Sequence, residues 1–495
     1  MYDHSYTMTL NNSVRNRIEE LAAKRILLFD GAMGAMIQAY RTPSGKPLNE
    51  DDFRGEPFRD HPLPIKGCGE VLCITRPDIV TEIHEAYMEA GADFSETCSF
   101  NANAISLADF GLAGYAYEFS LAAARLARAA ADKFSSPAKP RFVIGSMGPT
   151  SKSASISPDL NDPGKRAVTW DELEAAYYDN ARGLLDGGSD IILIETIIDS
   201  LNAKAAVYAV LRLANERGIE LPMIISASIM EKGGRILSGQ TLEAFCVSMA
   251  HANPLAIGLN CSFGAEKMKP HIAAVSAAVP FLICAYPNAG LPNQDGLYDQ
   301  DPETMAGHIE DYLREGLVNI IGGCCGTTPA HIAAIAARIP NYDPRPKVPG
   351  EATENTPGNI PLAGLEVLEF NKDDLGTLED LGENGDFIEF IKKGEYDDAV
   401  DLAREMTGDG PIKITADKLS PDGLSNFLNY ALPFPDLARL PLVLAGSSWA
   451  VIEAGLKCLP GKGLVSMGGI RAGDEEFNRL EKLIRPYGAV LIDSI

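Results

Sequence analysis

The chain has 495 residues, which is long enough for two or three domains, and 46% of them are hydrophobic, as in globular proteins. The formal net charge of −25 predicts a surface that repels nucleic acid and anionic membranes. Nine cysteines are too few, and odd in number, for a disulfide scaffold, and no uncharged apolar run is long enough for a membrane span. Met1–Ser5 has neither the basic start nor the apolar core of a signal peptide. We therefore expect a protein of a reducing, cytoplasmic compartment, with no nucleic acid or membrane partner.

Residues 1–14 are polar and predict a loose tail. From there to residue 340, short apolar runs alternate with longer segments of helical periodicity, which is typical of parallel strands joined by helices. The expected strands are 26–30, 93–97, 142–147, 191–195, 223–228, 256–260, 281–285 and 318–321. The expected helices include 14–24, 77–90, 116–133, 170–186, 203–217 and 304–315. Eight such units over residues 15–340 predict an α/β fold, a (β/α)8 TIM barrel with loop insertions.

A proline-rich segment follows the expected barrel. Six prolines within residues 340–362 predict an extended linker over 341–362. Beyond it, strands are expected at 411–415, 440–445, 464–467 and 489–492, and helices at 391–406, 422–430, 449–458 and 474–487. Residues 363–495 should therefore form a smaller, partial α/β barrel-like domain whose last strand is an open edge. We expect a partner chain, a second copy or the first barrel to cover that edge.

Three cysteines stand where expected barrel strands end. Cys324 and Cys325 lie in a glycine-rich turn after the last strand, and Cys261 follows the strand 256–260. The carboxyl ends of barrel strands meet at one rim, and thiolates are the ligands that Zn²⁺ prefers, with a fourth position open for substrate in catalytic sites. Two other interpretations remain open on chemistry alone: packed core cysteines, or a strained vicinal disulfide between Cys324 and Cys325.

The motifs around these cysteines resemble those of zinc-dependent homocysteine S-methyltransferases. The paired signature is Gly258–Cys261 with Gly322–Pro329, and Asp30–Gly34 and Ile194–Thr196 fit the same family. The resemblance is closest to the homocysteine module of cobalamin-dependent methionine synthases. It extends from about residue 15 to 340 and includes the stretches 154–158, 201–206, 237–241 and 287–293.

The resemblance implies a role for each matching residue. Cys261, Cys324 and Cys325 would hold zinc, and the sulfur of homocysteine would take the fourth position. Asp30 and Glu195 would bind the ammonium group of homocysteine by charge-assisted hydrogen bonds.

Three further residues are assigned to the site. Gly31 would contribute backbone contacts to homocysteine, Asn288 is a candidate fourth zinc ligand when no substrate is bound, and Ser228 is expected to line the pocket. Asp30 also fits a helix cap, Glu195 an internal ion pair, and Asn288 a turn.

One departure from the family pattern concerns a further thiol. Cys98 stands in Glu96–Phe100, where the family usually has asparagine. Cys98 is either a fourth thiol near the zinc, which would close the substrate position, or a small packed residue, and we favour packing.

The C-terminal part resembles the pterin-binding barrel of methionine synthases, but its second half is missing. Only Gly382–Asn384 stands near the place of the family's Gly-Glu-Arg-Thr-Asn turn, and the polar strand ends that contact the pterin are lost. Without those polar groups the domain is not expected to bind folate.

The resemblance predicts an enzyme that forms methionine from homocysteine. The family's cobalamin-binding motif Asp-x-His-x-x-Gly is absent, so the methyl group would come in trans, from methylcobalamin carried by a corrinoid protein. S-methylmethionine as donor, another thiol as acceptor, and a zinc-binding scaffold without catalysis remain the alternatives.

Overall fold

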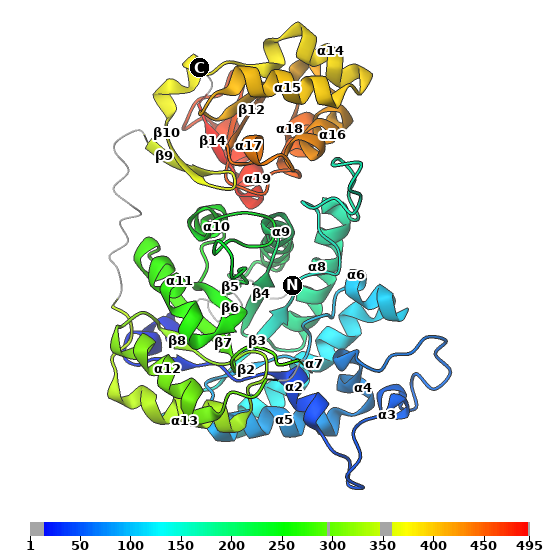
Figure 1. Ribbon diagram of the computed structural model, residues 1–495, viewed down its shortest axis with the longest axis vertical. Helices are drawn as coiled ribbons and strands as arrows, with labels where there is room; N and C mark the ends of the chain where they lie inside the picture. Colours follow the sequence, from blue (N-terminus) through cyan, green and yellow to red (C-terminus); the bar gives the residue numbers. More distant parts are fainter. Residues whose placement is uncertain (1–13, 295–297, 347–358, 494–495) are drawn as a thin grey trace.

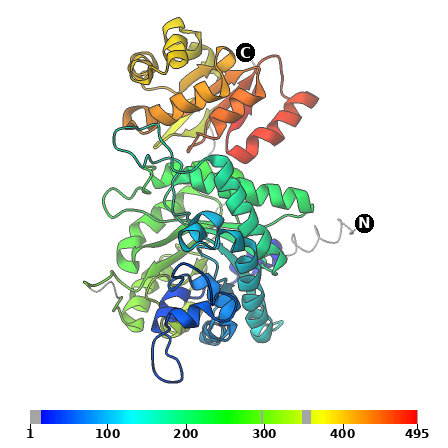
Figure 2. The ribbon, with the colours of Figure 1, turned by 90° about the vertical axis from the view of Figure 1, so that its right-hand side faces the viewer.

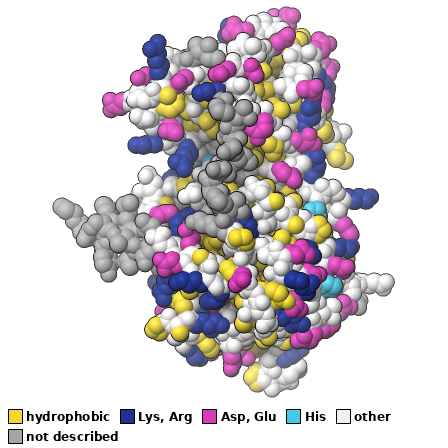
Figure 3. Space-filling model, turned by 90° about the vertical axis from the view of Figure 1, so that its left-hand side faces the viewer, with side chains coloured by type: hydrophobic (Ala, Val, Ile, Leu, Met, Phe, Trp, Pro, Cys, Tyr) yellow, Lys and Arg dark blue, Asp and Glu magenta, His cyan; other side chains and the backbone are white. Residues whose placement is uncertain are grey.

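The computed structural model describes residues 14–294, 298–346 and 359–493. They form two domains, which lie one above the other in Figure 1 and Figure 2. On the face drawn in Figure 3, acidic and basic side chains are interspersed over both domains. Within the described residues, no helix is both long and apolar enough to cross a membrane.

The larger domain is a parallel eight-stranded barrel. Its strands are β1 (Leu27–Leu28), β2 (Phe94–Glu96), β3 (Phe142–Met147), β4 (Ile191–Ile197), β5 (Met223–Ala227), β6 (Ala256–Gly264), β7 (Leu282–Asn288) and β8 (Ile320–Ile321). They pair in the order β1-β8-β7-β6-β5-β4-β3-β2. Strands β1 and β2, at the two ends of this order, meet where the Asp93 amide donates to the Leu28 carbonyl at 2.7 Å and the Leu28 amide donates to the Asp93 carboxylate at 2.9 Å. The predicted TIM barrel is confirmed.

Helices surround this barrel (Figure 1, Figure 2). The principal ones are α5 (Pro77–Ala90), α7 (Ala116–Phe134), α8 (Trp170–Asp186), α9 (Ser200–Arg217), α10 (Leu242–Met249), α11 (Ala265–Ala278), α12 (Pro302–Arg314) and α13 (Pro329–Arg338). Shorter helices are α2 (Met33–Ala39), α3 (Glu50–Arg54), α4 (Leu72–Thr75) and α6 (Ala104–Leu107), and residues 14–22 form a helix as expected.

The core of the barrel follows the two-residue period of its strands. Alternate residues such as Phe29, Leu193 and Tyr286 form one apolar cluster, while their neighbours Leu28 and Ile194 belong to the core shared with the helices. The strands are therefore buried on both faces, and polar groups gather where the strands end.

The smaller domain is built on a four-stranded parallel sheet. Its strands are β11 (Ile412–Thr415), β12 (Leu442–Gly446), β13 (Leu464–Met467) and β14 (Val490–Ile492), in that order. Its helices are α14 (Gly385–Lys393), α15 (Tyr396–Thr407), α16 (Pro421–Ala431), α17 (Pro435–Ala438), α18 (Trp449–Leu456) and α19 (Glu475–Ile484). The single helix expected over 391–406 is wrong, because Gly394 ends α14 with φ of +77° and a new helix begins at Tyr396.

A hairpin that the sequence did not predict covers one face of this sheet. It consists of β9 (Asn359–Ala363) and β10 (Val367–Asn371). Leu362 and Phe370 of the hairpin pack with Val443 and Leu464 of the sheet. The chain itself thus supplies the cover on this face, and coverage of the open edge by a partner stays a prediction.

The tail, the linker and the domain boundaries also stay predictions. The hairpin begins inside the range 341–362, while residues 347–358 and tail residues 1–13 lie outside the described residues.

The two domains touch along helices α8, α9 and α10. The Lys204 ammonium, fully buried in α9, donates to the carbonyl oxygens of Leu459 and Gly461, both at 2.7 Å. At the start of α8, Trp170 packs on Tyr487 with ring centroids 5.5 Å apart. The C-terminal domain thus rests against the outer helices of the barrel.

Candidate active site

The three predicted cysteines come together at the carboxyl end of the barrel. Their sulfur atoms all lie within 4.8 Å of one another, and those of Cys261 and Cys325 are 3.6 Å apart. Among His, Cys, Asp and Glu side chains of the described residues, no other group of three converges in this way. A disulfide between Cys324 and Cys325 is not present, since all three cysteines are free.

Backbone constraints hold the three sulfurs in place. Cys261 has a φ of +59°, which is rare for a residue with a side chain. The Asn288 amide donates to the Cys261 carbonyl and accepts from the Cys325 amide at 3.1 Å. At Gly323 an added Cβ would lie 2.5 Å from Thr327, so only glycine fits this turn. Asn288 therefore aligns two of the cysteines, and its role as a zinc ligand stays a prediction.

Sharing of protons links the thiols electrostatically. Hydrogen bonds from Cys261 and Cys324 lower the pKa of the Cys325 thiol to about 3, whereas hydrogen bonds with the other two raise the pKa of Cys324 well above its ordinary value. The Cys325 thiolate therefore accepts hydrogen bonds from the protonated thiols of Cys261 and Cys324. A divalent cation would displace those protons, and three thiolates form a donor set that suits Zn²⁺.

Carboxyl groups lie on the same rim. Asp30 follows β1 and accepts a hydrogen bond from the Glu96 amide at 2.9 Å. Glu195, near the end of β4, accepts from the Ser146 hydroxyl and from the Asn260 amide at 3.1 Å. Both Asp30 and Glu195 are 3% exposed, and burial raises the pKa of each above its ordinary value. Buried carboxyls without a cationic partner are suited to bind one from a substrate.

The alternative interpretations of these two acids can be tested directly. Helix α2 has Ala32 at its N-cap and no side-chain cap, so Asp30 is not a helix cap. Among the described residues, Glu195 forms no ion pair with a Lys, Arg or His side chain. Asp30 and Glu195 are therefore held by neutral donors and keep their capacity for a cation.

The turn after Asp30 is joined to the cysteine turn. At Gly31 an added Cβ would lie 2.7 Å from the Thr327 hydroxyl and 2.8 Å from the Tyr87 ring. The Thr327 hydroxyl accepts from the Ala32 amide at 3.1 Å and donates to the Cys324 carbonyl at 2.7 Å. Gly31 thus allows the acid-bearing and thiol-bearing turns to approach each other.

Two other predicted positions differ in their surroundings. Cys98 lies outside the three-sulfur group, and its thiol donates to the Gly69 carbonyl at 3.6 Å, which supports packing rather than metal binding. Ser228 follows β5 and its amide donates to the Ile197 carbonyl at 2.9 Å. Ser228 therefore lies on the rim, and its contact with substrate stays a prediction.

Several residues of this site were missed by sequence reasoning. Asn260 contacts Glu195 and Thr196, Ser146 donates to Glu195, and Glu96 adds a third carboxyl group. Burial, followed by the charges of Glu195 and Asp30, raises the pKa of Glu96 well above its ordinary value. Two of these residues stand in stretches already compared with the family, Asn260 directly before Cys261 and Glu96 at the start of Glu96–Phe100.

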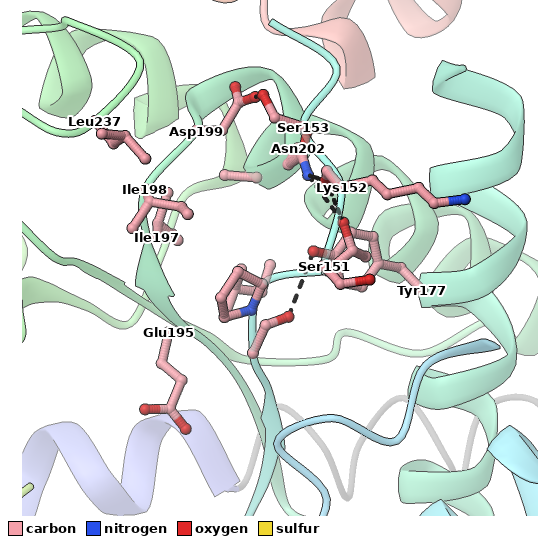
Figure 4. A pocket seen from close by; sticks show the side chains of 15 residues that line it. Ser151, Lys152, Ser153, Tyr177, Glu195, Ile197, Ile198, Asp199, Asn202 and Leu237 are labelled. Atoms are coloured by element: carbon pink, nitrogen blue, oxygen red, sulfur yellow. Dashed lines mark hydrogen bonds between the residues drawn. The ribbon is translucent and has the colours of Figure 1, made fainter. Parts of the chain in front are cut away.

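A cavity of about 220 Å³ lies behind this site. Its walls include Ser151, Tyr177 and Asn202, between the ends of β3 and β4 and the helices that follow them. Figure 4 shows the Glu195 carboxyl group pointing away from this cavity. Glu195 thus lines the cavity but turns its carboxyl group away from it.

A TIM barrel with thiols and carboxyls gathered at its carboxyl rim defines a class of enzymes that act on small molecules at that rim. The family model of homocysteine S-methyltransferases matches residues 27–339, so the chain belongs to this family and is a methyltransferase.

Solved structures of the homocysteine methyltransferase MmuM from Escherichia coli are similar to this chain. The oxidized form is 23% identical, with 63% of this chain and 96% of MmuM covered and a TM-score of 0.48. The metallated form is 24% identical, with 65% and 98% covered and the same TM-score of 0.48.

Proposed function

We propose that this protein methylates homocysteine to methionine, with Zn²⁺ held by Cys261, Cys324 and Cys325. The observation that carries the proposal is the convergence of three sulfur atoms within 4.8 Å beside two buried carboxyls that have no cationic partner among the described residues. Family membership supports homocysteine as the methyl acceptor.

The residues of the chain divide the work between the two ends of the substrate. Zinc, when bound, would keep the substrate sulfur as a thiolate near neutral pH. Asp30 and Glu195 would hold the ammonium group, and the Gly31 turn would face the amino-acid end. In the transfer, a sulfur–carbon bond forms, the bond from the methyl carbon to the donor breaks, and the thiol proton has left for solvent on binding.

Binding of the ammonium group would also change the protonation of the Asp30 and Glu195 carboxyls. Burial favours the protonated forms of Asp30 and Glu195 when no cation is present. An ammonium group would favour their ionised forms and donate charge-assisted hydrogen bonds to them in place of the lost protons.

The methyl donor is proposed to be a methylcorrinoid protein acting in trans. The resemblance of residues 15–340 to the homocysteine module of cobalamin-dependent methionine synthases supports a corrinoid donor. Folate is not proposed as the donor, because the polar strand ends that contact the pterin in the family are lost from this sequence. At the end of β11, the Thr415 hydroxyl donates instead to the Asp380 carboxylate at 2.6 Å.

A methyl-transfer assay on zinc-loaded protein tests the proposal. Homocysteine is offered with methylcobalamin, methyltetrahydrofolate or S-methylmethionine, and methionine is measured. Turnover with methylcobalamin supports a corrinoid donor. Turnover with S-methylmethionine alone, or with methyltetrahydrofolate alone, would overturn the corrinoid assignment in favour of that molecule. Methylation of other thiols but not homocysteine would overturn the acceptor, and silence with every donor despite bound zinc would favour a scaffold.

Cysteine variants provide the matched control. Cys325→Ala should lose bound zinc and activity together, because two thiolates hold zinc poorly. Cys246→Ala removes a buried cysteine from α10, outside the three-sulfur group, and should keep both. Full zinc content in Cys325→Ala would contradict the assignment of the ligand.

A further inference from the structure

We propose that Asn260 is a positioning residue that couples the ammonium-binding carboxylate to the metal-binding thiols. This inference rests on the proposed function and extends it to a side chain that lies between the two halves of the substrate site. Asn260 is the fifth residue of β6, directly before Cys261, and it is fully buried.

The side-chain amide of Asn260 is saturated with three partner residues from the neighbouring strands β4 and β5. Its oxygen accepts from the Thr196 backbone amide at 3.0 Å and from the Ser226 hydroxyl at 2.7 Å. Its nitrogen donates to Glu195 at 3.1 Å and to the Thr196 hydroxyl at 2.7 Å. Because a primary amide has two donors and two acceptor sites, no hydrogen-bonding capacity is left over.

The contacts with Thr196 fix an unusual backbone. Thr196 has a φ of +51°, and the pairing of β4 with β5 shifts register between Ile194 and Ile197. Such a bulge redirects a side chain next to a site. The two hydrogen bonds between Asn260 and Thr196, one in each direction, hold this bulge and so set the direction in which Glu195 points.

The same side chain reaches the thiols. The Asn260 nitrogen lies 4.0 Å from the Cys324 sulfur, and the Asn260 backbone leads directly into Cys261 with its positive φ. One neutral amide therefore touches the carboxylate and approaches the thiol. A carboxylate in its place would lose both donors and add a negative charge beside Glu195.

The closing experiment compares Asn260→Ala and Asn260→Asp with Asn319→Ala. Asn319 is also buried in the barrel, where it accepts from the Ile283 amide and donates to the Arg345 carbonyl, both at 3.0 Å. Homocysteine KM and kcat, zinc affinity by competition with a chelator, and thermal midpoint are measured for each protein.

We expect all three variants to lower the thermal midpoint, but only the Asn260 variants to raise the homocysteine KM or weaken zinc binding, by about ten- to hundredfold. The Asn260→Asp variant should be the more impaired of the two in homocysteine KM. Ser226→Ala removes one hydrogen-bond donor to Asn260 and leaves Asn260 in place, so it should change homocysteine KM and zinc affinity in the same direction by a smaller factor. This variant tests the proposal if the Asn260 variants do not fold.

Unchanged homocysteine KM and zinc affinity in the Asn260 variants, or equal losses in Asn319→Ala, would overturn the role of Asn260. Failure of the proposed function would show differently, as absence of homocysteine binding or turnover in the unaltered protein.

Discussion

The residues of the rim carry acidic groups that repel one another when ionised. Three thiols and three carboxyl groups lie close together, and protons shared among them offset their mutual repulsion when no cation is bound. A metal ion at the sulfurs and an ammonium group at the carboxyls would replace those protons. The rim thus gathers two sets of acidic groups, thiols and carboxyls, a short distance apart.

Removal of one carboxylate should weaken binding of amine-bearing thiols only. Glu195→Gln is expected to raise the homocysteine KM by about ten- to hundredfold, because a hydrogen bond to a charged group is lost. A thiol of similar length without the amino group should be used as before. Glu174→Gln in α8, whose carboxylate pairs with Arg212 at 2.7 Å, is the control. An equal loss with both thiols would show that Glu195 acts on the fold rather than on the ammonium group.

The raised pKa values predict a pH dependence of binding. In the empty site, burial raises the pKa values of the Asp30 and Glu195 carboxyls above their ordinary value of about 4. Binding of an ammonium group requires the ionised forms of both carboxyls. Homocysteine affinity should therefore increase as pH rises through the raised pKa values, with release of protons. Calorimetric titrations at several pH values and in buffers of different ionisation enthalpy measure both effects. Affinity that is constant from acid to neutral pH would contradict this prediction.

The sequence predicted the residues that carry distinctive chemistry. Cys261, Cys324 and Cys325 were found because thiols at strand ends are rare, and Asp30 through its family motif. Asn260 and Ser146 were missed because their importance depends on which strand lies beside Glu195, and the register of neighbouring strands is not written in local sequence.

Local patterns predicted most elements of both domains, and the exceptions have physical causes. Apolar runs gave all eight barrel strands, although β1 and β8 pair over only two residues each. Gly394 divides a helical pattern because it adopts a left-handed conformation. The hairpin β9–β10 was missed because Pro361 and its neighbouring prolines favoured a linker, yet proline is tolerated in edge strands.

The space around two glycines, one between barrel strands and one on an outer helix, predicts opposite effects of replacing each by alanine. In Gly258→Ala, the new Cβ would lie 1.7 Å from the Cys284 carbonyl oxygen, so the strands must separate, at a cost of at least about 3 kcal/mol. Gly307→Ala in α12 meets no atom within 4 Å and should stabilise the helix by about 1 kcal/mol. Denaturant unfolding of both variants provides the comparison. If Gly258→Ala is as stable as the unaltered protein, β6 and β7 are less closely packed than described.

At the scale of the whole molecule, the interface joins helices that follow β3 and β4 to the C-terminal domain. Lys204 reaches two backbone carbonyls, Asp171 pairs with Lys457 at 2.9 Å, and Trp170 packs on Tyr487. These contacts lie in the first turn of α8 and the second turn of α9. The C-terminal domain therefore supports the side of the barrel on which Glu195 stands.

Loss of Lys204 should destabilise both domains together. Lys204→Met leaves two buried carbonyl groups unpaired and should lower the free energy of unfolding by about 2 kcal/mol. Burial lowers the pKa of Lys204 to about 7, below the unfolded value of about 10.4. Between these values the unfolded chain binds the extra proton, so the stability contributed by Lys204 should increase as pH rises from about 7 to 10.

Unfolding of both proteins across this pH range measures the difference. A difference in free energy that decreases with rising pH would contradict the lowered pKa of Lys204.

The position of α9 between two domains has a consequence for any attempt to separate them. Twelve of its 18 residues are buried, against six of 14 in α5. A protease that cut between the domains would leave fragments that remain associated, since their separation would expose the apolar outer side of α9 to water. A barrel produced alone would carry that side uncovered and would tend to aggregate.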